Sequence, residues 1–164
     1  MADGSVTYTQ AGGWHVLRYS GRVDYTMAPA IERFVDGLEH APKPFLFDLC
    51  DANILDSTNL GLLARVVERS RKDGAPRCSM IVHAGDVDDV VRSMGFEQIV
   101  DIKSDSPLGE EVEPQALVTD ERASQGEMLR TMLEAHRALI GLDDHDCSQW
   151  REVVSALEAE MRTR

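Results

Sequence analysis

Apolar and polar positions along the first forty residues change from a strand pattern to a helix pattern. Residues 6–9 and 14–19 are predicted to form two strands, and Gly12-Gly13 between them is typical of a hairpin turn. Helical spacing follows, with a start marked by Thr26 and Pro29. The apolar side of this predicted helix consists of Ala30, Ile31, Phe34, Val35 and Leu38.

The stretch from Phe45 to Arg71 predicts a buried strand, a short acidic turn and a helix. Its nearly continuous apolar start, FLFDL, is the pattern of a strand covered on both faces. From Leu60 onward the apolar residues recur with helical spacing, on a stripe of Leu60, Leu63, Ala64 and Val67. The helix is predicted to open at Asp56-Ser57-Thr58 and to end at Asp73-Gly74.

Three further elements complete the first hundred residues. Residues 78–82 are predicted to form a strand, residues 86–93 a short helix that ends before Gly95, and residues 96–102 a last strand. The resulting order is β-β-α-β-α-β-α-β. Strands that alternate with helices predict an α/β fold with a mixed, mostly parallel sheet packed by helices.

The pattern changes after residue 103. Residues 104–123 are rich in Glu and contain Pro107, Gly109 and Pro114, which predicts an acidic linker. Residues 124–164 carry two helical apolar stripes, which predict a helical hairpin. The predicted domains are therefore 1–103, 104–123 and 124–164. Because two helices bury little by themselves, they should dock on the first domain, on a second copy in a homodimer, or on a partner.

Charge narrows the classes of partner. The formal net charge is −12, with 11 Lys and Arg against 15 Asp and Glu in residues 1–103, and 6 against 14 in residues 104–164. Such a surface disfavours direct binding to nucleic acid and to acidic membranes. The sequence shows no membrane-span pattern and no signal-peptide core, and its three cysteines are widely separated. These features predict a cytoplasmic protein.

Several short motifs in this order make the first 103 residues similar to a known family. They are Gly21-Arg-Val-Asp24 at a strand end, the strand FLFDL, the run from Leu55 to Leu63 (LDSTNLGLL), and Met94-Gly-Phe96. Together they resemble the STAS domain of bacterial anti-sigma factor antagonists. The resemblance implies a STAS fold, and a phosphoprotein of a partner-switching pathway that regulates transcription. It covers about residues 5–103 and says nothing of the C-terminal hairpin.

The resemblance assigns roles to five residues around the predicted helix start. It implies that a cognate anti-sigma factor with serine kinase activity phosphorylates Ser57, with Thr58 a less suitable acceptor. It implies that a PP2C-type phosphatase, in some pathways a response-regulator output domain, removes the phosphate. Asp24 and Asp56 match acidic positions on the face that contacts the kinase, and with Ser57, Thr58 and Asn59 they make up the partner-binding set that the resemblance implies. Asn59 stands where the family often has glycine. No cofactor is implied.

Other interpretations of these residues remain open at this point. Ser57 could be a plain helix cap, and Asp24 and Asp56 could equally be a turn residue and a cap. The domain could also bind a small molecule or serve a transporter without a phosphoswitch. A serine hydrolase is disfavoured, because no G-x-S-x-G motif surrounds Ser57 and Asp56 would oppose alkoxide formation. The spacing of His136, His145 and Cys147 fits no zinc pattern, so no metal site is predicted.

Overall fold

A six-stranded mixed sheet forms the centre of the computed structural model, which describes residues 4–38, 42–109, 112–118, 123–142 and 148–163. The strands are β1 (Ser5–Ala11), β2 (Trp14–Val23), β3 (Phe45–Leu55), β4 (Ser79–Ile81), β5 (Asp101–Lys103) and β6 (Ala116–Leu117). Their order in the sheet is β5-β4-β3-β2-β1-β6. The neighbours from β2 to β5 are parallel, whereas β1 pairs antiparallel with both β2 and β6. The fold is therefore α/β with a mostly parallel sheet, as the sequence predicts.

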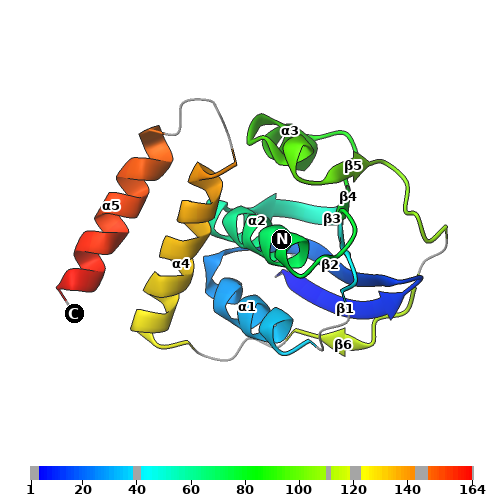
Figure 1. Cartoon of the computed structure of the whole chain (residues 1–164), viewed down its shortest axis with the longest axis horizontal. Helices are drawn as coiled ribbons and strands as arrows, with labels where there is room; N and C mark the ends of the chain where they lie inside the picture. Colours follow the sequence, from blue (N-terminus) through cyan, green and yellow to red (C-terminus); the bar gives the residue numbers. More distant parts are fainter. Residues whose placement is uncertain (1–3, 39–41, 110–111, 119–122, 143–147, 164) are drawn as a thin grey trace.

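Helices cover one face of this sheet (Figure 1). The helices of the first domain are α1 (Ala28–Asp36), α2 (Ser57–Lys72) and α3 (Asp86–Ser93), with short 3₁₀ turns η1 (Tyr25–Met27) and η2 (Phe96–Gln98). The main core lies beneath them, and Leu17, Tyr19, Phe47 and Leu63 are among its wholly buried side chains. The opposite face carries a smaller cluster of Val16, Leu46 and Ile81.

The C-terminal hairpin forms as predicted and packs on the first domain. Its helices are α4 (Gln125–Ile140) and α5 (Ser148–Arg162). Figure 1 shows α4 between α5 and the helices of the first domain. The long side chains Leu133, Val154 and Leu157 form a core cluster that lies entirely between α4 and α5. The hairpin thus has a core of its own in addition to its contact with α2.

Three predicted elements differ from the structure. The predicted acidic turn before Asp56 is part of β3, because β2 continues to pair with this strand as far as Leu55, across two register shifts. The predicted strand 96–102 begins as the 3₁₀ turn η2, which follows Gly95 in the left-handed conformation, and only its end forms β5. The predicted linker contains β6, which pairs with the edge strand β1.

Candidate functional site

Two parallel strands end together at the predicted site. Val23 at the end of β2 lies opposite Leu55 at the end of β3. Asp24 and Asp56, which follow these two residues, are therefore brought together at one edge of the sheet. Asn59 fixes this arrangement, because its amide nitrogen Nδ2 donates to the carbonyl oxygen of Val23 at 3.3 Å. The topology thus gathers the predicted acidic residues at the start of α2.

Asp56 is the residue that caps α2. Its extended backbone (φ −81°, ψ 173°) places the carboxylate beside the first turn, and Oδ1 accepts from the backbone N–H of Asn59 at 3.0 Å. The same oxygen accepts from Asn59 Nδ2 at 3.0 Å. The alternative in which Ser57 is the cap is therefore wrong. Ser57 is the first helical residue, and its hydroxyl is not engaged in capping.

Asp24 shapes the turn that enters α1. Its Oδ1 accepts from the backbone N–H of Thr26 at 3.0 Å and from the Thr26 hydroxyl at 2.5 Å. These bonds cap η1, and the Asp24 side chain remains partly exposed. Asp24 therefore combines a structural role with a carboxylate at the surface beside Asp56.

The hydroxyl of Ser57 is bonded to a histidine from the C-terminal hairpin. Ser57 Oγ lies 2.8 Å from Nε2 of His136 on α4. The other ring nitrogen, Nδ1, lies 2.7 Å from the carbonyl oxygen of Met132, which can only accept. In the neutral ring, Nδ1 therefore carries the proton and Nε2 accepts, so Ser57 is the donor. Trp150 of α5 packs beside the same ring, with 5.8 Å between the ring centroids.

His136 is the residue of this site that sequence reasoning missed as a partner of Ser57. The sequence contained one signal for its position. His136 falls on the apolar stripe of its helix, four residues after Met132 and three before Leu139. A polar side chain on an apolar stripe faces the packed side of the helix, and His136 is only 3% exposed.

The remaining predicted partner-binding residues lie inside the protein. Thr58 is 3% exposed and Asn59 is wholly buried, because the second and third residues of α2 face the core. The Asn59 amide oxygen has no hydrogen-bond partner. In this arrangement neither side chain offers surface to a partner, and Asp24, Asp56 and Ser57 are the members of the set that are partly exposed to solvent.

In the part of the chain that the structure describes, no three His, Cys, Asp or Glu side chains gather where they could hold a metal ion. His145 and Cys147 lie outside the described residues. Burial, with the nearby Asp48 carboxylate, raises the pKa of Cys50 to about 12. That thiol therefore stays protonated and weakly nucleophilic at neutral pH.

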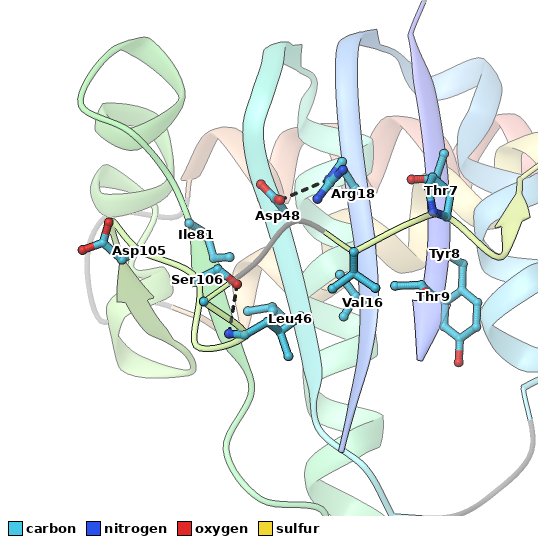
Figure 2. A pocket seen from close by; sticks show the side chains of 14 residues that line it. Thr7, Tyr8, Thr9, Val16, Arg18, Leu46, Asp48, Ile81, Asp105 and Ser106 are labelled. Atoms are coloured by element: carbon cyan, nitrogen blue, oxygen red, sulfur yellow. Dashed lines mark hydrogen bonds and ion pairs between the residues drawn. The ribbon is translucent and has the colours of Figure 1, made fainter. Parts of the chain in front are cut away.

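A hollow of about 420 Å³ lies on the sheet face opposite the helices. Val16, Leu46 and Ile81 form its apolar floor, and the Arg18–Asp48 ion pair lies among them, with Arg18 Nε 3.2 Å from Asp48 Oδ2 (Figure 2). Thr9 also lines the hollow. Its hydroxyl is buried and has no hydrogen-bond partner.

The family assignment rests on the part of the chain that holds this site. The family profile that describes the STAS domain matches residues 5–108, which include Asp24, Asp56 and Ser57. No curated protein matches the chain. Among the helices within the described ranges, none has the length and apolar character needed to cross a membrane. Because the profile covers more than half of the sequence, the chain belongs to the STAS domain family.

Proposed function

We propose that this chain is an anti-sigma factor antagonist of a bacterial partner-switching pathway and acts in the cytoplasm. Unphosphorylated at Ser57, it binds an anti-sigma factor with serine kinase activity and so releases a sigma factor. Phosphorylation of Ser57 ends that binding, and a PP2C-type phosphatase, in some pathways a response-regulator output domain, restores it. The observation that carries the proposal is the position of Ser57 in a STAS domain, as the first residue of α2 and next to the capping carboxylate of Asp56.

The start of α2 suits a residue that gains and loses a phosphate. The first amides of a helix have no partner within the helix, and the helix dipole is positive at this end. In α2 the Asp56 carboxylate accepts a hydrogen bond from the backbone amide of Asn59. The amides of Ser57 and Thr58 lack intrahelical acceptors and so favour an anion on Ser57. The domain should therefore stay folded when Ser57 is phosphorylated.

The same phosphate changes what a partner meets at this surface. It adds a charge of about −1.5 to −2 beside Asp56 and Asp24. A like charge on the partner about 4 Å from this phosphate would cost the complex about 4 kcal/mol at an effective dielectric constant of about 20. A loss of this size changes a dissociation constant by more than about a hundredfold. A partner surface that fits the neutral serine is thus released by phosphorylation.

Phosphorylation by the kinase of the native cells tests the proposal. Purified wild-type chain, Ser57→Ala and Thr58→Val are each incubated with ATP and an extract of those cells, and the intact mass is measured. We expect one added phosphate on the wild type and on Thr58→Val, and none on Ser57→Ala. Thr58→Val is the matched control, because it removes the adjacent hydroxyl. Phosphate on Ser57→Ala, or no phosphate on any variant, contradicts the proposal.

We also propose that the Ser57–His136 pair is not an enzyme site, although a serine bonded to a histidine resembles a nucleophile with its base. The Asp56 carboxylate at the same turn opposes an alkoxide on Ser57, and Trp150 packs beside the histidine ring. We expect no labelling of Ser57 by a fluorophosphonate probe in intact-mass spectra. Stoichiometric labelling that is lost in His136→Ala would instead identify a serine hydrolase.

A second candidate function is a small-molecule-binding STAS module that works without a phosphoswitch. The hollow on the open sheet face favours it, because the Thr9 hydroxyl is buried there without a partner. Native mass spectrometry of the chain purified from its own cells tests this candidate. A bound small molecule that is absent from Val16→Trp, which fills the apolar floor, supports it; a spectrum of the bare chain counts against it.

A further inference from the structure

We propose that α4 and α5 form a cover over Ser57 that opens as one unit, and that kinase and anti-sigma partner reach Ser57 only in the open form. The identity of those partners rests on the proposed function, whereas the opening rests on the packing alone. The closed arrangement is the one the structure holds. It makes the chain an antagonist that inhibits itself through its C-terminal hairpin.

The Ser57 hydroxyl points its proton at the cover. In the 2.8 Å bond between Ser57 Oγ and His136 Nε2, the ring occupies the position that the proton-accepting group of a kinase must take when the hydroxyl is phosphorylated. His136 is held there from two sides, by the carbonyl oxygen of Met132 and by the ring of Trp150. Because Trp150 belongs to α5, both hairpin helices take part in covering Ser57. The histidine must leave before Ser57 can enter a kinase site.

A close backbone contact packs α4 against α2, the helix that begins with Ser57. A Cβ atom added at Gly61 of α2 would lie 2.1 Å from the carbonyl oxygen of Ala135 on α4 and 2.8 Å from its Cβ. Only glycine at this position lets the two helices approach so closely. Gly61 lies one helical turn after Ser57, so the Gly61–Ala135 contact and the Ser57–His136 hydrogen bond are adjacent.

The two faces of α4 make different kinds of contact, as expected if α4 separates from α2 and stays packed on α5. Toward α2 the central contacts involve a glycine, an alanine and a histidine bonded to a serine. Toward α5, Leu133 packs with Val154 and Leu157 in a cluster separate from the main core. The hairpin therefore keeps its own apolar core when it leaves α2. Leu139 and Leu142 of the same segment pack into the main core and keep the closed form favoured.

Charged groups at the start of α4 add a contact that salt can weaken. Arg33 Nη1 of α1 lies 2.5 Å from Glu127 Oε1 in the first turn of α4. Exposed ion pairs contribute little to stability and are screened by salt. This pair therefore helps to orient α4 over the helices of the sheet without preventing its release.

Native-state hydrogen exchange of the wild-type chain tests the opening without any partner. Amides of α4 and α5 should exchange through an opening that exposes less surface than global unfolding, so their exchange rates should depend less on denaturant than those of β2 and β3. We expect exchange in α4 at least about tenfold faster than in β3. Equal rates with equal denaturant dependence would overturn the proposal.

A pair of glycine substitutions tests the link to Ser57. Gly61→Ala places a Cβ against Ala135, whereas the control Gly126→Ala makes the same change on α4 with nothing within 4 Å of the added atom. We expect Gly61→Ala to raise α4 exchange and the rate of Ser57 phosphorylation, each by about tenfold, the effect of about 1.4 kcal/mol. We expect Gly126→Ala to raise neither.

The outcomes of these experiments distinguish a failure of the proposed cover from a failure of the proposed function. The proposed cover is overturned if Gly61→Ala leaves hydrogen exchange in α4 unchanged. It is also overturned if exchange in α4 becomes faster while Ser57 is phosphorylated at the wild-type rate. Faster exchange on a chain that no kinase phosphorylates overturns the proposed function and supports the opening. If Gly61→Ala unfolds the whole domain, the wild-type exchange experiment still decides whether the hairpin opens by itself.

Discussion

Different side chains at the start of α2 cap the helix, bridge it to β2 and provide the serine of the proposed switch. Asp56 satisfies the amide of Asn59, and Asn59 in turn holds the end of β2 through the carbonyl of Val23. Ser57 is left with a hydroxyl that is not needed for the fold of the first domain. A residue that can be modified without breaking a cap is suited to a reversible switch.

Removing the cap should destabilise the domain. Asp56→Ala deletes the acceptor for two groups of Asn59, and we expect the free energy of unfolding to fall by about 1–2 kcal/mol. Asp56→Asn is the matched control, because asparagine caps helices as well as aspartate does and should restore most of the loss. Urea unfolding followed by circular dichroism measures both; equal stability of Asp56→Ala and wild type would contradict the cap.

His15 should make stability depend on pH. It is 4% exposed, its Nδ1 lies 2.6 Å from the Tyr8 hydroxyl, and burial, then the Lys43 charge, lowers its pKa. Below about pH 6.5 the unfolded chain therefore binds a proton that the folded chain does not. The free energy of unfolding should fall as the pH drops from 7 to 5.

A double variant isolates this contribution of His15. Tyr8→Phe with His15→Phe removes both members of the hydrogen bond together, so neither is left buried without a partner. We expect a smaller pH dependence between pH 5 and 7 in the double variant than in the wild type, measured by urea unfolding. The same slope in both proteins would show that His15 does not contribute.

At the scale of elements, one arginine holds the 3₁₀ turn η2 and the edge strand β5 in place. Arg77 Nε lies 2.9 Å from Asp101 Oδ1, and Nη2 donates to the carbonyl oxygens of Glu97 at 2.9 Å and Val100 at 3.1 Å. These bonds span the segment from η2 to β5. They explain how a three-residue edge strand keeps its register beside β4.

Substituting Arg77 should loosen this segment. Arg77→Ala leaves the carbonyls without their donor, and we expect a loss of about 1–2 kcal/mol in the free energy of unfolding, with faster hydrogen exchange confined to η2 and β5. Arg77→Lys should recover little of the lost free energy of unfolding, because a single ammonium group cannot reproduce the several planar N–H donors of the guanidinium. Recovery of full stability by lysine would show that charge alone is sufficient.

At the scale of the molecule, the apolar stripes of the hairpin are used within the chain. Val154 and Leu157 of α5 are buried against Leu133, and Trp150 packs against the main core. Little apolar surface of the described hairpin is therefore left for a second copy, and the net charge of −12 opposes self-association.

We therefore expect a monomer of 18.2 kDa in solution. Size-exclusion chromatography with light scattering, at micromolar concentration and physiological salt, measures the mass directly. A stable dimer would show that the hairpin also serves as an interface between copies, which the sequence left open. Gly61→Ala, which should release the hairpin, provides a second sample in which exposed apolar surface would favour association.

The sequence predicts the elements of the fold and the position of the serine in the proposed switch. Short apolar runs indicate the strands, helical spacing indicates α1, α2, α4 and α5, and the run from Leu55 to Leu63 locates Ser57. These features depend on neighbours along the chain, which the sequence shows directly. The end of β3 and the start of β5 were predicted wrongly, because their extent depends on which strand pairs beside them.

What covers Ser57 was decided by the tertiary structure alone. Ser57 and His136 are 79 residues apart, and the Gly61–Ala135 contact spans a similar distance along the chain. Apolar periodicity shows that α4 has a buried face, but it does not show which surface that face meets. The sequence by itself therefore determined a STAS domain with a serine at a helix start. Only packing, which brings distant segments within hydrogen-bond distance, decided that the chain's own hairpin lies over that serine.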